Sequence, residues 1–75
     1  MNPIKKIREK EGITREELAM AADVSYTTVV NIERGRAKKV NEDILDVLEE
    51  LGCNRNEIED EYNTFREECR KEILK

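Results

Sequence analysis

The chain has 75 residues, of which 37% are hydrophobic, 43% are charged and only 4% are aromatic. That length allows one small domain with a single modest core and excludes a large catalytic scaffold. Apolar residues nevertheless recur at helical spacing in every segment, which predicts a folded helical domain rather than a disordered chain.

The sequence contains no histidine. Histidine is the commonest general base and the commonest zinc ligand, so most hydrolase and metal sites lose their central residue. The sequence also lacks a phosphate-cradling glycine loop and a nucleophile motif. We therefore expect no enzyme activity, no metal and no cofactor.

The two cysteines, Cys53 and Cys69, are 16 residues apart and form no C-x-x-C pair. This spacing favours two reduced, partly buried thiols over a disulfide framework or a metal knuckle. No apolar run approaches the roughly 20 residues of a membrane span, and the N-terminus lacks the apolar block of a secretory signal. We expect a soluble, cytoplasmic protein that does not contact a membrane.

The net charge of −4 is distributed unevenly along the chain. Residues 1–40 contain nine Lys/Arg and six Asp/Glu, a net charge of +3, whereas residues 41–75 contain five and twelve, a net charge of −7. The two halves should therefore face different partners, and only the basic half is suited to contact phosphate groups.

Start and stop signals predict five helices, and the first two have the clearest ends. Asn2 caps the first helix, a proline follows at the first helical position, and Gly12 ends the helix. Thr14 and Glu17 form a capping box for the second helix, which runs over about residues 14–22.

A tight turn at Asp23 leads into a third helix over about residues 25–34. Ser25 caps this helix and Gly35 ends it. Two short helices joined by about three residues form the geometry that projects the second helix, the recognition helix, into the major groove of DNA.

The fourth and fifth helices lie in the acidic half. Asn41 caps the fourth, Gly52 ends it, and Leu51 is expected on its apolar face. The fifth starts at Asn54, with Glu57 completing a capping box. Its apolar positions form a narrow stripe on a heavily charged helix: Ile58, Tyr62, Phe65, Cys69 and Ile73.

A helical wheel divides the third predicted helix into two arcs. The outward arc, which is able to read bases, consists of Tyr26, Thr27, Val30, Asn31 and Arg34. The inward arc is apolar or small and consists of Thr28, Val29 and Ile32.

The segment also carries a recurrent motif. Its residues are Arg15-Glu16-Glu17-Leu18-Ala19, Val24-Ser25, Val29, Ile32-Glu33 and Gly35. Through them the chain from Ile4 to Leu51 resembles the Cro/repressor (XRE-type) helix-turn-helix family. The resemblance implies an all-α fold, a five-helix bundle of the repressor DNA-binding domain type with a long C-terminal helix. Residues 1–52 would form the DNA-binding core, and residues 53–75 an acidic amphipathic helix.

The resemblance places Tyr26, Thr27 and Asn31 at positions that face base edges, with Val30 between them. Asparagine can pair with adenine through two hydrogen bonds, whereas threonine and valine can contact a thymine methyl group. The family pattern also pairs the first-helix arginine, Arg8, with the glutamate that precedes the basic segment, Glu33. We expect that pair to be structural.

Polar and cationic side chains at the ends of the two central helices are candidates for phosphate contacts. They are Arg15, Ser25, Arg34, Arg36, Lys38 and Lys39. A solvated loop is the alternative interpretation of residues 36–39. Their position directly after the recognition helix favours the phosphate contact.

The fifth predicted helix is long for a domain of this size. About 21 residues would extend about 31 Å, so its first half can pack on the domain while residues 65–74 pair with a second chain. We expect a homodimer, because two half-sites about one DNA turn apart multiply affinity and specificity. The candidate dimer residues are Tyr62, Phe65, Cys69 and Ile73.

Together these features predict a regulator that binds double-stranded DNA sequence-specifically, with repression at a palindromic operator as the role that the resemblance implies. The alternative, from a different class, is an antitoxin or anti-regulator. Such a protein would use the acidic C-terminal helix to mimic or mask a basic protein surface.

Overall fold

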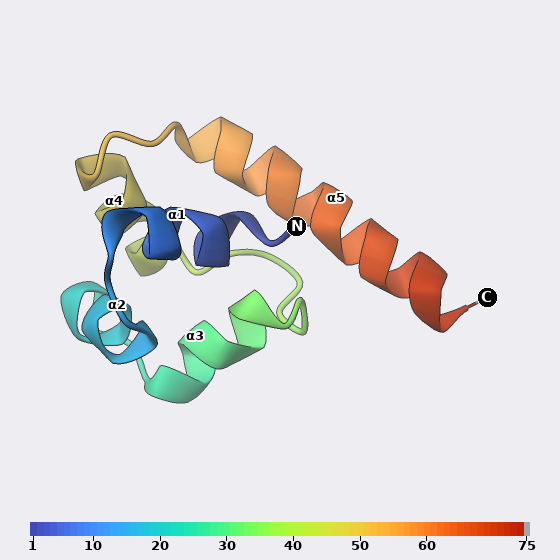
Figure 1. Cartoon of the computed structure of the whole chain (residues 1–75), viewed down its shortest axis with the longest axis horizontal. Coiled ribbons are helices and arrows are strands. Elements are labelled where there is room, and N and C mark those ends of the chain that lie inside the picture. Colours follow the sequence, from blue (N-terminus) through green and yellow to red (C-terminus); the bar gives the residue numbers. More distant parts are fainter. Residues whose placement is uncertain (75) are drawn as a thin grey trace.

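The computed structural model describes residues 1–74, which form five α-helices and no strand (Figure 1). The helices are α1 (Pro3–Glu11), α2 (Arg15–Ala22), α3 (Tyr26–Glu33), α4 (Glu42–Glu50) and α5 (Arg55–Ile73). The predicted all-α class is confirmed, and each helix lies where its sequence signals placed it.

Every helix begins at the polar residue that the sequence indicated. These caps are Asn2, Thr14, Ser25, Asn41 and Asn54. At α2 the capping box is closed in both directions, because the Glu17 amide donates to Thr14 Oγ1 at 3.1 Å and the Thr14 amide donates to Glu17 Oε1 at 2.8 Å. These side chains replace the carbonyl acceptors that the first turn of a helix lacks, and so they fix where each helix starts.

The turn between α2 and α3 consists of the three residues that follow Ala22. Asp23 adopts a left-handed conformation with φ 55°. Its amide donates to the Met20 carbonyl, and the next amide, from Val24, donates to the Ala19 carbonyl. These bonds and the left-handed residue confirm the predicted tight turn. Aspartate adopts the left-handed region more readily than most residues.

One hydrophobic core joins all five helices. Its most deeply buried side chains are Ile4, Leu18, Val29, Ile32, Ile44, Leu45, Leu48, Ile58 and Tyr62. α2 packs on α3 and α4, whereas α5 packs on α1 and α4. Ile58 and Tyr62 lie beyond the boundary expected at residue 52 and yet belong to this core. The described residues after 52 therefore pack on the same core as the residues before it.

One expected core position is wrong. Leu51 is 39% exposed, although its spacing from Ile44 and Leu48 placed it on the same helical face. Leu51 is the C-cap of α4, one residue beyond the end of the helix at Glu50.

An ion cluster fixes the start of α5 on α4. The Arg55 guanidinium contacts Glu49, Asp46 and Glu42, which lie about one turn apart along α4. Hydrogen bonds to these carboxylates raise the pKa of Arg55, and the bond to Glu49 contributes most. The cluster joins the first residue of α5 to successive turns of α4.

The C-terminal half of α5 projects beyond the other helices (Figure 1). The helix has 19 residues, a length of about 28 Å. At its end, Ile73 is 82% exposed and Leu74 is 68% exposed. The overhang that helix length predicted is therefore present. Over residues 1–74, no helix is both long and apolar enough to cross a membrane.

The apolar stripe of α5 serves two environments. Tyr62 is 1% exposed, so its assignment to a dimer interface is wrong: the domain's own core already covers it. Phe65 is half-buried and packs against the same core. The first half of α5 thus packs on the domain, which was the alternative to pairing with a second chain. Cys69 is a half-buried free thiol, as is Cys53 near the start of the helix.

Candidate nucleic-acid interface

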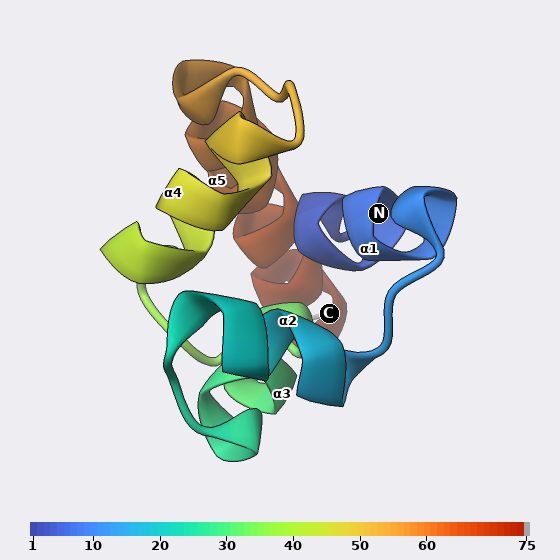
Figure 2. The same cartoon turned by 90° about the vertical axis from the view of Figure 1, so that its left-hand side faces the viewer.

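α2 and α3 lie side by side at one end of the molecule, below α1 and α4 in Figure 2. α3 is anchored by its inner side, where Val29 and Ile32 are fully buried. Tyr26, Thr27 and Arg34 are exposed on the opposite side, and Val30 and Asn31 are half-buried beside them. The outward arc predicted from the wheel is therefore the free surface of α3, which we call the outer face of α3.

Thr28 occupies an intermediate position between the two arcs. It is half-buried, and its hydroxyl lies 2.9 Å from the hydroxyl of Ser25. Ser25 Oγ also accepts the Thr28 amide at 3.1 Å, which closes the N-terminal cap of α3. Ser25 remains exposed, so its predicted phosphate contact is compatible with this capping role.

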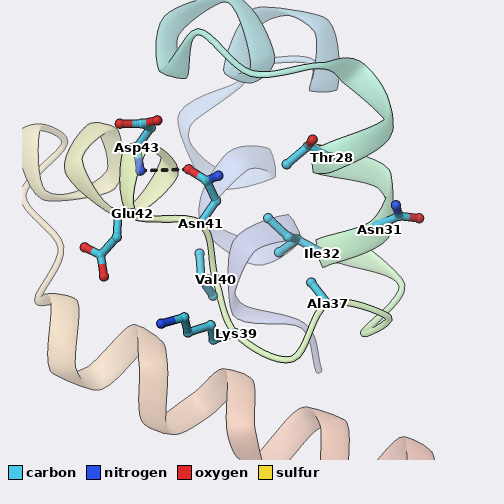
Figure 3. A pocket seen from close by; sticks show the side chains of 9 residues that line it. All are labelled: Thr28, Asn31, Ile32, Ala37, Lys39, Val40, Asn41, Glu42 and Asp43. Atoms are coloured by element: carbon cyan, nitrogen blue, oxygen red, sulfur yellow. Dashed lines mark hydrogen bonds between the residues drawn. The ribbon is translucent and has the colours of Figure 1, made fainter.

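A shallow depression of about 430 Å³ separates α3 from the segment that enters α4 (Figure 3). Thr28 and Ile32 point toward it, and Asn31 lines its edge with the carboxamide extending outward from α3. Within residues 1–74 the Asn31 carboxamide has no side-chain hydrogen-bond partner. Its donor and its acceptor are therefore both free for a ligand.

Glu33, at the last turn of α3, is the centre of an ionic cluster. Arg8 Nε donates to Glu33 Oε2 at 2.8 Å and a second Arg8 nitrogen donates to Oε1 at 3.2 Å, which confirms the predicted pair. Arg15 Nε donates to the same Oε1 at 3.0 Å. Burial alone would raise the pKa of Glu33, but the hydrogen bonds from the two arginines outweigh burial and lower it.

The bond between Arg15 and Glu33 adds a structural role to a residue that the sequence assigned to phosphate. Hydrogen bonding to Glu33, and then to Tyr26, raises the pKa of Arg15. Arg15 thus links the first residue of α2 to the last residue of α3, Glu33. Its side chain is still 39% exposed, so the phosphate contact stays a prediction.

Asn2 ties the N-terminus to the end of α3. Its oxygen caps α1 by accepting the amides of Ile4 and Lys5 at 2.9 and 3.1 Å. Its nitrogen donates to the carbonyls of Ile32 and Glu33, both at 3.0 Å. The sequence indicated only the cap, because the second function depends on a helix 30 residues away.

The segment after α3, residues 35–39, presents its cations to solvent, and we call it the basic loop. Arg36, Lys38 and Lys39 in this loop are exposed, as is Arg34 just before it. The other side of the loop faces α5. Tyr62 donates its hydroxyl to the Ala37 carbonyl at 2.8 Å.

Arg66 continues the contact one turn further along α5. Its Nε donates to the Gly35 carbonyl at 3.1 Å and a terminal nitrogen donates to the Lys38 carbonyl at 3.0 Å. Nothing in the sequence pointed to Arg66, which lies about 30 residues from the loop and looks like any other charge on an acidic helix.

A short helix, a three-residue turn and a second helix with a free polar outer face, next to an exposed basic loop, define a helix-turn-helix DNA-binding regulator. A helix-turn-helix family model matches residues 4–58, and the chain belongs to this XRE-type family, which comprises DNA-binding regulators rather than enzymes. Comparison with curated proteins and with solved structures gives no significant match. The match extends through Ile58, so it includes the part of α5 that begins to complete the core.

Proposed function

We propose that the protein is a transcriptional repressor that binds a palindromic operator as a homodimer and inserts α3 into the major groove. The observation that carries this proposal is the free Asn31 carboxamide on the outer face of α3, with the exposed cations of the basic loop directly after that helix in the chain. Repression would follow from occlusion of the promoter by the bound dimer.

The outer face of α3 offers the chemistry for reading bases. Asn31 can accept from N6 and donate to N7 of one adenine, and Thr27 and Val30 can contact a thymine methyl group. A bidentate contact of this kind discriminates between bases by about 1–3 kcal/mol. Tyr26, at 45% exposure, is available to a base or to the sugar-phosphate backbone.

Phosphate contacts would come from the cations that border this face. They are Arg15, Arg34, Arg36, Lys38 and Lys39, and the Ser25 hydroxyl adds an uncharged contact. Each neutralised phosphate releases counterions, which makes the affinity fall with salt in proportion to the number of contacts. The acidic helices α4 and α5 would stay off the DNA.

The projecting half of α5 is the proposed dimer contact. Cys69 and Ile73 are four residues apart and so share one side of it, and Phe65, one turn before Cys69, packs against the core. Pairing of two such helices would remove exposed apolar surface from water and place two copies of α3 for successive turns of the major groove.

Selection from a randomised duplex pool at about physiological salt, followed by sizing of the bound complex, tests the whole proposal. We expect a palindrome with half-site centres about 10 base pairs apart and a complex with two chains. Recovery of no motif by the folded protein would overturn the proposal. It would favour instead the antitoxin or anti-regulator function, in which the acidic helix binds a protein.

A further inference from the structure

The basic loop makes few backbone hydrogen bonds of its own, although Ala37 packs against the core. It lies between α3 and α4, and its amides make two bonds back to α3: Gly35 to the Ile32 carbonyl at 3.0 Å and Arg36 to the Asn31 carbonyl at 2.9 Å. Its long cationic side chains are exposed and make no ion pair within residues 1–74. A segment of this kind stays mobile unless another element holds it.

α5 supplies that support through three residues on the side of the helix that faces the loop: Tyr62, Phe65 and Arg66. The Tyr62 hydroxyl holds the Ala37 carbonyl, Arg66 bridges the carbonyls of Gly35 and Lys38, and the Phe65 ring lies against Gly35. Three of the four carbonyls over residues 35–38 are thereby bound from one side. With the carbonyls facing α5, the side chains of Arg36 and Lys38 extend toward solvent.

We propose that Tyr62 and Arg66 are positioning residues for DNA binding, which hold the basic loop in the conformation that presents its cations to phosphate. The inference rests on the proposed phosphate role of the loop. It makes α5 part of the DNA-binding apparatus, although the helix is acidic and lies behind the interface. A fixed loop binds more tightly because its ordering is complete before DNA arrives.

Tyr62→Phe is the cleanest variant, because it keeps the ring in the core, changes no charge and removes only the hydroxyl that holds Ala37. Affinity for a mixed-sequence duplex should fall by about 2-fold to 10-fold, the effect of one hydrogen bond. Hydrogen exchange at the amides of residues 36–39 should become faster, and thermal unfolding should confirm that the variant remains folded.

Arg66→Gln removes both bridging bonds together with one positive charge. Its matched control is Arg70→Gln, which removes the same charge one turn further along α5, outside the contacts with the loop. Arg66→Gln should weaken binding more than the control does. It should also make the plot of log affinity against log salt shallower by about one, the loss of one phosphate contact.

Lys38→Ala, measured on the same duplex, distinguishes the phosphate role of the basic loop from the positioning role of Tyr62 and Arg66. If Lys38→Ala leaves the salt slope unchanged, the phosphate role of the loop fails, and the positioning role fails with it. If Lys38→Ala flattens the slope while Tyr62→Phe binds like the native protein, only the positioning role is overturned. If Arg66→Gln and Arg70→Gln had equal effects, Arg66 would act only through its charge, and the positioning role would be overturned.

Discussion

The ring of Phe65 lies directly against Gly35, so that a β-carbon added to Gly35 would be 2.9 Å from Phe65 Cε2. Gly35 also has a left-handed backbone with φ 76°. Two independent constraints, conformation and space, therefore select glycine where α3 passes into the basic loop.

Gly35→Ala should therefore destabilise the domain more than an alanine substitution at a glycine where only the backbone conformation is constrained. Gly12→Ala is the matched control, because Gly12 has a similar φ of 70° but nothing lies within 4 Å of its added β-carbon. Left-handed strain alone costs about 1–2 kcal/mol, which is our expectation for Gly12→Ala, and Gly35→Ala should exceed it. Urea unfolding measures both, and equal losses would show that the Phe65 contact yields without cost.

The ionic cluster around Glu33 should make stability depend on pH. The folded state lowers the pKa of Glu33 below its ordinary value of 4.5, so the unfolded state binds more protons as the pH falls. The stabilisation from this group is therefore complete above about pH 5 and is lost as the pH falls through the folded-state pKa.

Glu33→Gln isolates this contribution. Removing one partner of a buried ion pair costs about 3–5 kcal/mol, and we expect about 3 kcal/mol because Arg15 is 39% exposed. The difference from the native protein should be constant near neutral pH and should shrink in acid. Glu61→Gln, at an exposed position on α5, serves as control. A difference that persists unchanged in acid would contradict the role assigned to the carboxylate.

Asn31→Ala should lower the ratio of specific to non-specific affinity, because it removes the bidentate contact proposed for adenine. A loss of about 1–3 kcal/mol in discrimination is expected at one base pair of the half-site. Competition between the selected operator and mixed-sequence DNA measures it. An unchanged ratio would mean that another face of α3 reads the bases.

Lys38→Ala should act differently at the same interface. Loss of one phosphate contact weakens binding to all sequences about equally and reduces the salt slope by about one. Titrations at several salt concentrations against operator and mixed-sequence duplexes distinguish the two effects. If Lys38→Ala changed sequence preference instead, the basic loop would have to contact base edges.

The projecting end of α5 should determine the oligomeric state. Ile73 is 82% exposed in the single chain, so Ile73→Asp should leave the fold intact while it places a charge in the proposed dimer contact. We expect a shift toward monomer in sedimentation and weaker operator binding. Asn63→Asp adds the same charge at another exposed position of α5 and should leave the dimer unchanged. A native dimer in the Ile73 variant would place the contact elsewhere.

The sequence alone determined the local structure and the surface it displays. Thr14 and Glu17 fixed the start of α2, because capping bonds join residues three apart and need no tertiary contact. The wheel also separated the outer face of α3 from its buried side, since helical periodicity is a local property. The pair of Arg8 and Glu33 was accessible through the family resemblance.

Only the tertiary structure decided which partner covers each face. The stripe on α5 predicted an apolar surface, but periodicity is the same whether that surface meets the domain or a second chain, and Tyr62 proved to be in the core. The second bond to Glu33, from Arg15, and the bridge from Arg66 to the basic loop join residues 18 to 31 positions apart. Such contacts arise from the angles at which helices pack, and the local sequence does not encode those angles.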